Sequence, residues 1–156
     1  MAFAVKSELL QGLREDLGLR RIGSGMARLD DYWSETGRLD PKDSDAQLQL
    51  GIVEFQFGGR EAAAASFSKV LELDPKNASA LNNLGSVAFL DGDFAGAEQD
   101  FLKAADADAS DGDVWLNLAK TAAKLKKADK AREYGGKAIA LSPGYKPFID
   151  NLVNGL

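Results

Sequence analysis

The chain contains no cysteine and no histidine, and carboxylates and amides are prominent among the side chains that could still do chemistry. Without cysteine and histidine the chain cannot form disulfides, thiolate or imidazole zinc sites, cysteine nucleophiles or histidine bases. Two short Asp-Gly-Asp clusters remain, at residues 91–93 and 111–113. Paired carboxylates could bind Ca²⁺ or share acid and base roles, but a calcium loop needs a longer series of ligands. Asp and Gly are also typical of turns, so we predict no enzyme activity, no metal site and no cofactor.

Amide side chains recur at a fixed interval of 34 residues, at Gln49, Asn83 and Asn117. An amide offers both a hydrogen-bond donor and an acceptor, so an aligned row of amides could pair with the backbone of an extended peptide. The same interval separates LDPKDSDAQLQLG, which begins at residue 39, from LDPKNASALNNLG, which begins at residue 73. A repeat of this length predicts stacked structural units. Other columns at this interval are Leu50, Leu84 and Leu118; Gly51, Gly85 and Ala119; Ala63, Ala97 and Ala131; and Phe67 and Phe101.

Each unit is predicted to be a pair of antiparallel helices. Residues 47–57 place apolar side chains at helical spacing, and Gly58-Gly59 then ends the helix as a C-cap. Residues 61–73 form the second helix, which stops before Pro75 because the residue preceding a proline disfavours the helical conformation. Asn77 and Asp111 stand where the N-caps of the next two pairs are expected.

Two glycines in the repeat columns predict close contacts between helices. A glycine inside a helix costs about 1 kcal/mol relative to alanine, so Gly51 and Gly85 need a compensating contact. We predict that small residues let the two helices of a pair approach closely. Phe67 or Phe101 would then fill the adjacent gap.

These columns resemble the tetratricopeptide repeat, a helix-turn-helix unit of 34 residues. The resemblance covers residues 44–143, although Glu54, Ala109 and Gly135 depart from the family's pattern. It implies an all-α solenoid of antiparallel helix pairs, wound into a right-handed superhelix. Residues 1–43 are expected to be a divergent helical pair, which is either a degenerate first repeat or an unrelated element. The other expected units are repeats at residues 44–77, 78–111 and 112–145, and a C-terminal capping helix at residues 146–156.

The resemblance also implies that the first helix of each pair lines a concave groove, which suits an extended peptide or a partner helix. A carboxylate clamp, another groove chemistry of the family, would need Lys and Asn at Leu48 and Ile52 and a cation at Asn117, so we do not expect one. Phe55 and Phe89 share a column near the groove, and either anchor a partner's side chain or pack between repeats. The side chains expected to face the groove are Gln49, Ile52, Gln56, Asn82, Asn83, Ser86, Asn117, Lys120 and Lys124.

The formal net charge of −5 argues against nonspecific binding to nucleic acids, which depends on neutralising phosphates. The charge is unevenly placed, because residues 91–113 are mostly acidic while residues 120–137 form a basic segment. These segments are either solvated helix faces or a dipolar surface that steers a partner or a second copy of the chain. Lys120 and Lys124 lie one helical turn apart and would favour an acidic segment of a ligand.

No apolar run approaches the roughly 18 residues of a membrane span, and the N-terminus lacks the pattern of a targeting signal. We therefore expect a soluble, cytoplasmic protein that does not bind membranes. The leading hypothesis is a non-enzymatic adaptor that binds a protein or peptide in its groove. The alternative is a scaffold protein that uses the same repeats to form a homo-oligomer.

Overall fold

The computed structural model describes residues 42–155 of the chain, so nearly all of the divergent N-terminal pair expected at residues 1–43 lies outside the described part. Within residues 42–155 the chain forms α-helices and one 3-10 turn, with no strand. The helices are α3 (Ser44–Gln56), α4 (Arg60–Leu73), α5 (Ala78–Leu90), α6 (Phe94–Ala107), α7 (Gly112–Lys124), α8 (Ala128–Leu141) and α9 (Lys146–Asn154), and the 3-10 turn is Pro143–Tyr145.

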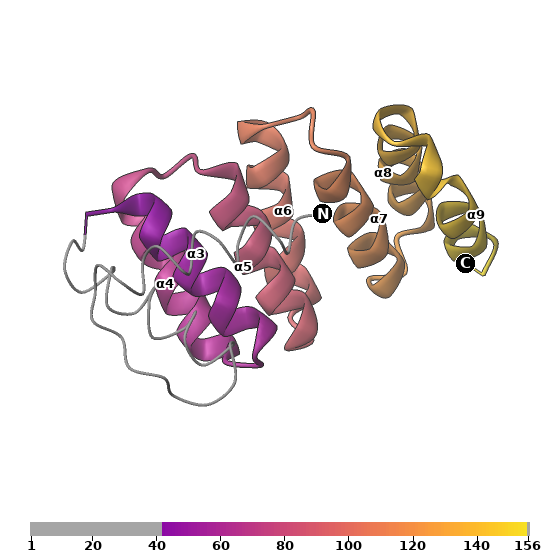
Figure 1. The fold of residues 1–156 in the computed structure, drawn as a ribbon. Coiled ribbons are helices and arrows are strands. Elements are labelled where there is room, and N and C mark those ends of the chain that lie inside the picture. The colour runs from indigo at the N-terminus through magenta and orange to yellow at the C-terminus, as the bar shows by residue number, and fades with distance from the viewer. Residues whose placement is uncertain (1–41, 156) are drawn as a thin grey trace, which may run out of the picture.

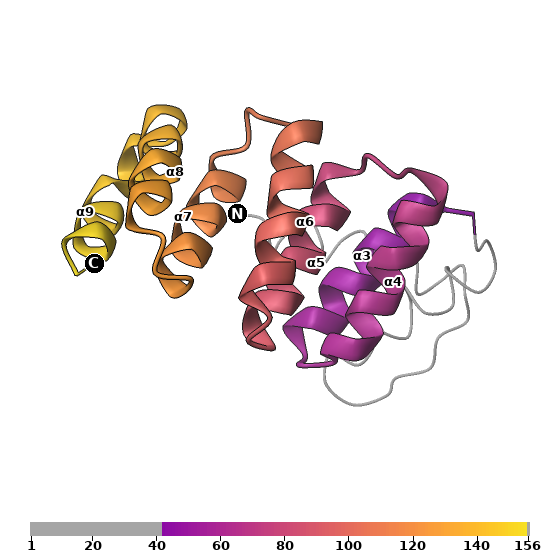
Figure 2. The same cartoon turned by 180° about the vertical axis from the view of Figure 1, so that it is seen from behind.

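The helices are arranged as a row of hairpins, in which α3 pairs with α4, α5 with α6 and α7 with α8 (Figure 1). Seen from behind, the second helices α4 and α6 lie in front of their partners (Figure 2). The first helices also contact one another, because α5 touches both α3 and α7. These contacts indicate that the row curves toward the first helices, and we call the face lined by α3, α5 and α7 the inner face. The predicted all-α solenoid of helix pairs is confirmed.

The helix ends follow local signals in the sequence. The Asn77 side chain accepts a hydrogen bond from the Ala80 amide at 3.0 Å, and the Asp111 side chain accepts one from the Asp113 amide at 2.8 Å. Both residues therefore act as the predicted N-caps, because they satisfy backbone donors that have no partner within the helix. Gly58 ends the first helix of its pair with a positive φ of 81°, a conformation that favours glycine.

The predicted close approach of helices occurs at the glycine columns. A Cβ atom placed on Gly51 would lie 2.6 Å from Cε1 of Phe67, and one placed on Gly85 would lie 2.7 Å from Cδ1 of Phe101. Both phenylalanine side chains are fully buried. The rings therefore lie directly against the helix backbone at these glycines, where any larger residue would overlap them.

The third helix pair reverses this arrangement. Ala119 takes the place of the first-helix glycine, and Gly135 takes the place of the second-helix phenylalanine. A Cβ atom on Gly135 would lie 2.6 Å from Cγ2 of Ile149, which is buried on α9. Tyr134, one residue earlier, is also buried. The missing aromatic ring thus leaves room for α9 to pack closely on α8.

None of the helices found in residues 42–155 combines the length and the apolar character needed to cross a bilayer.

Candidate functional site

The three first helices carry the nine side chains that the sequence predicted for a binding groove. On α3, Gln49 and Ile52 are half-buried and Gln56 is exposed. Ile52 also packs against the apolar core between the first two hairpins. The residues on α5 and α7 are Asn82, Asn83, Ser86, Asn117 and Lys120, all half-buried, and Lys124, which is exposed.

Two of these helices are joined by a pair of amides. The Asn117 side-chain nitrogen on α7 donates to the Asn82 side-chain oxygen on α5, at 3.1 Å. Lys120, one turn further along α7, donates from Nζ to the Asn117 side-chain oxygen at 3.4 Å. The inner face therefore carries a polar bridge between neighbouring repeats, with one cation attached to it.

The amide bridge differs from the column that the repeat period predicted. The column placed Asn117 in register with Asn83, but Asn83 instead donates to the Ser79 carbonyl of its own helix at 2.9 Å. Ser86 likewise donates from its hydroxyl to the Asn82 carbonyl at 2.9 Å. The period identifies equivalent positions on successive helices, whereas contact depends on how each helix is rotated against the next.

A pocket of about 210 Å³ opens on the inner face beside this bridge. Phe55 and Phe89, for which the sequence left two roles open, both line the pocket while remaining half-buried. Phe89 is held by an edge-on contact with the Phe94 ring, at 5.2 Å between centroids. The full lining is Phe55, Ser86, Phe89, Leu90, Phe101, Asn117 and Lys120.

Sequence reasoning missed two residues of this pocket. Leu90 was not proposed for the groove, although it is 57% exposed and shares a column with the proposed residues Gln56 and Lys124. Phe101 was assigned to the gap beside Gly85, and it also lines the pocket. The column of Leu90 was a signal that could have found the first of these residues.

The carboxylate clusters at the turns have structural roles. Asp93 caps α6 by accepting from the Gly96 amide at 2.9 Å, and Asp91 forms an ion pair with Arg60 at 2.7 Å. Asp111 caps α7, as described above. Across residues 42–155, no group of three or more acidic side chains is arranged to hold a metal ion.

The sequence matches the family described as Tetratricopeptide repeat over residues 48–112 and 93–146. The chain belongs to the tetratricopeptide repeat family. A comparison with curated proteins finds no match.

Solved structures of tetratricopeptide repeat proteins share this fold. The crystal structure of MamA is 23% identical, with a TM-score of 0.73 over 80% of this chain and 72% of that chain. A MamA from Desulfovibrio magneticus RS-1 is 22% identical, with a TM-score of 0.71 over 88% of this chain and 76% of that chain. YrrB, described as a TPR protein with an unusual peptide-binding site, is 24% identical, with a TM-score of 0.67 over 71% of this chain and 57% of that chain.

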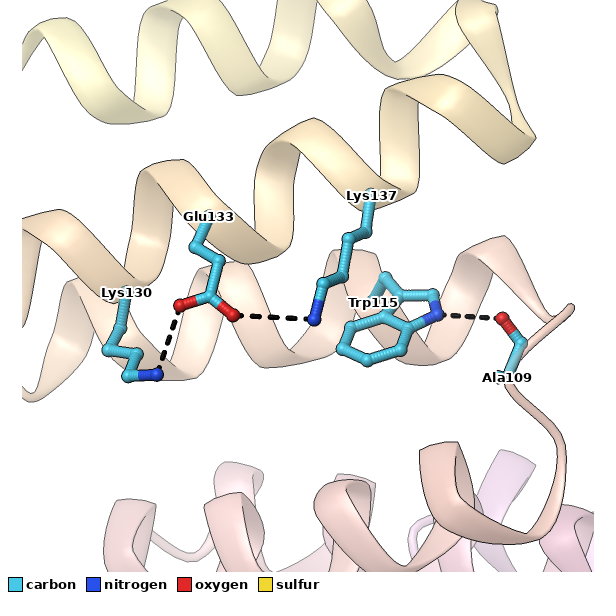
Figure 3. A network of polar contacts seen from close by, with 5 residues as sticks. All are labelled: Ala109, Trp115, Lys130, Glu133 and Lys137. Atoms are coloured by element: carbon cyan, nitrogen blue, oxygen red, sulfur yellow. Dashed lines mark hydrogen bonds and ion pairs between the residues drawn. The ribbon is translucent and has the colours of Figure 1, made fainter.

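The third helix pair, α7 and α8, carries the basic segment of residues 120–137, and the lysines of α8 are paired there (Figure 3). The Glu133 carboxylate accepts hydrogen bonds from the Lys130 ammonium at 3.0 Å and from the Lys137 ammonium at 3.3 Å. The hydrogen bond from Lys130, followed by that from Lys137, lowers the pKa of Glu133 below its usual value. Lys137 also lies 4.2 Å from the centre of the Trp115 ring, and the indole nitrogen donates to the Ala109 carbonyl. The α8 lysines therefore already have partners within the chain.

Proposed function

We propose that the inner face binds an extended segment of a partner protein and that the chain catalyses no reaction. Tetratricopeptide repeats are protein-interaction modules, and the observation that carries the finer proposal is the pocket beside the amide bridge. Phe55 and Phe89 form an aromatic wall that can bury a partner's side chain. Asn82 and Asn117 offer amide groups next to it that can pair with the partner's backbone.

The size of the pocket supports a protein ligand. Sites that enclose a whole small molecule typically measure about 300–1,000 Å³, whereas this pocket measures about 210 Å³. It therefore fits one side chain of a larger partner, with the remainder of the partner lying along the inner face. The peptide-binding site in the description of YrrB, a protein of the same fold, also supports a peptide as the class of ligand.

A peptide-display selection on the full chain tests this proposal. Selected peptides are labelled, and their affinity is measured by fluorescence anisotropy for the wild type and for the double variant Asn82→Ala/Asn117→Ala. Each net hydrogen bond contributes about 0.5–1.5 kcal/mol, so loss of both amides should weaken binding roughly tenfold.

The control variant is Gln99→Ala, which removes an exposed amide on α6 that is not part of the pocket. Binding to this variant should equal binding to the wild type. The proposal fails if selection enriches no peptide, or if the enriched peptides bind the double variant as tightly as they bind the wild type.

Self-assembly is a second candidate, and one feature of α9 favours it. Phe148 is 49% exposed on the outer helix of the row, where a further helix or a second copy of the chain could cover it. Sedimentation velocity of the wild type and of Phe148→Asp separates the two functions. A monomeric wild type at low and high salt argues against assembly, and a concentration-dependent oligomer that Phe148→Asp disperses supports it.

A further inference from the structure

The part of the inner face formed by α5 and α7 has a charge opposite in sign to that of the whole chain. The chain carries a net charge of −5, yet α5 contains no charged residue, and after Asp113 the only charged side chains of α7 are Lys120 and Lys124. The wall formed by α5 and most of α7 is therefore positive. This local sign suits an anionic ligand.

Lys120 carries this charge at the edge of the pocket. Its ammonium lies 5.8 Å from the centre of the Phe89 ring and 3.4 Å from the Asn117 side-chain oxygen. Within residues 42–155, no carboxylate lies within the 4.0 Å of an ion pair from this ammonium. Lys120 is thus half-buried beside an apolar pocket, and it forms no ion pair with any carboxylate of residues 42–155.

Five other lysines in residues 42–155 are neutralised by carboxylates. Lys127 pairs with Glu98 at 2.6 Å, and Glu133 serves both Lys130 and Lys137 (Figure 3). Lys103 on α6 and Lys146 on α9 also form ion pairs within their own helices. Lys120 differs from these lysines because it lines the pocket without such an ion pair. A carboxylate of a bound partner could therefore pair with it there.

Resting on the proposed function, we infer that the pocket selects a partner segment in which an apolar residue is followed closely by Asp or Glu. The apolar side chain enters among Phe55, Phe89 and Leu90, and the carboxylate accepts from the Lys120 ammonium at the rim. Burial of the apolar group lowers the local dielectric, so the new ion pair is stronger than one on an open surface. The acidic residue is a side-chain carboxylate within the segment, and no free C-terminus is needed.

Three matched peptides test this inference. Each is a labelled peptide with a blocked N-terminus and an amidated C-terminus, built around one phenylalanine that is followed by Asp, Asn or Lys in the three versions. At low salt the Asp peptide should bind the wild type roughly three- to tenfold more tightly than the Asn peptide. The ion pair between Lys120 and the Asp of the peptide should be stronger than an exposed ion pair and weaker than a buried charge-assisted hydrogen bond. The Lys peptide should bind most weakly, and high salt should reduce the difference.

Two lysine variants complete the test. Lys120→Gln should bind the Asp and Asn peptides equally, whereas Lys103→Gln, which makes the same charge change on α6, should keep the preference for Asp. Equal binding of the Asp and Asn peptides by the wild type overturns the inference and leaves the proposed groove standing. An undiminished Asp preference in Lys120→Gln also overturns it. If none of the three peptides binds, the inference is wrong; failure of the proposed function is read separately, from the display selection.

Discussion

At the scale of single residues, the fold depends on the helix positions at which glycine stands in place of a larger residue. Phe67 and Phe101 occupy the space that a Cβ atom on Gly51 or Gly85 would take. Each glycine gives up helix propensity of about 1 kcal/mol, and the fully buried ring against it restores more than this by excluding water. The packing of the first two hairpins therefore depends on a matched pair of residues in each.

Gly85→Ala tests this matched pair. The new methyl group would overlap the Phe101 ring, which costs about 1–3 kcal/mol when a core is overpacked and exceeds the gain in helix propensity. We expect a lower free energy of unfolding in urea. Gly136→Ala on α8 is the control, because no atom lies within 4 Å of its added Cβ, and it should stabilise the chain by about 0.5–1 kcal/mol. A Gly85→Ala variant as stable as Gly136→Ala would contradict the account.

The turn between the two helices of each hairpin gives a second test at this scale. Gly58, Gly92 and Lys126 occupy equivalent positions, and all three have a positive φ, which is 58° at Lys126. A residue with a Cβ atom pays about 1–2 kcal/mol in this conformation. Lys126→Gly should therefore raise the free energy of unfolding by about 1 kcal/mol, and Gly92→Ala should lower it by a similar amount. An unchanged melting temperature in both variants would show that these turns are not strained.

At the scale of the elements, α9 packs on the second helix of the third pair, α8. Ile149 enters the space left by Gly135, while Phe148, its neighbour, remains half exposed. A repeat can bury its apolar face only against an adjacent unit. Helix α9 therefore gives α8 such a neighbour.

Ile149→Ala should loosen this end of the row. Removal of a buried isoleucine side chain typically costs about 2–5 kcal/mol, and nearest-neighbour coupling should confine the effect to α8 and α9. Hydrogen exchange should become faster in these helices and stay unchanged in α3 and α4. Phe148→Ala is the matched control and should cause a much smaller change. Uniformly faster exchange along the whole row after Ile149→Ala would argue against a local cap.

The segment before α9 contains a contact that depends on pH. The Tyr145 hydroxyl donates to the Asp113 carboxylate, and this hydrogen bond, with burial as a smaller cause, raises the pKa of Tyr145 above its ordinary value. Because the folded state holds the neutral phenol, the stabilisation is complete below the unfolded pKa of about 10 and is lost as the pH rises beyond it. The melting temperature of the wild type should fall more steeply above pH 10 than that of Tyr145→Phe. Parallel curves for the two proteins would show that the contact contributes nothing.

At the scale of the whole molecule, the architecture could be predicted from the sequence because repetition multiplies weak signals. The caps Asn77 and Asp111 and the contacts at Gly51 and Gly85 are local features, and each lies where the period placed it. The N-terminal 41 residues lie outside the described part, so their predicted helical pair stays a prediction.

The candidate site could be predicted only in part. Among the side chains predicted for the groove, Ser86, Asn117 and Lys120 line one pocket, and their role in binding stays a prediction. The period did not show that Asn117 would meet Asn82, because contacts between helices depend on their rotation and offset, which residue spacing does not determine. It also gave no reason to expect Leu90 at the rim, where an apolar residue is exposed to solvent.

The central claim is that a partner segment lies on the inner face, and chemical-shift mapping of the full chain by NMR tests it most directly. The labelled protein is titrated with a peptide obtained from the display selection. The account predicts that the largest shifts fall on the amides of Ser86, Phe89, Asn117 and Lys120, with little change on α4 and α8. Shifts that centre on α8 and α9 and leave α5 and α7 unmoved would contradict it.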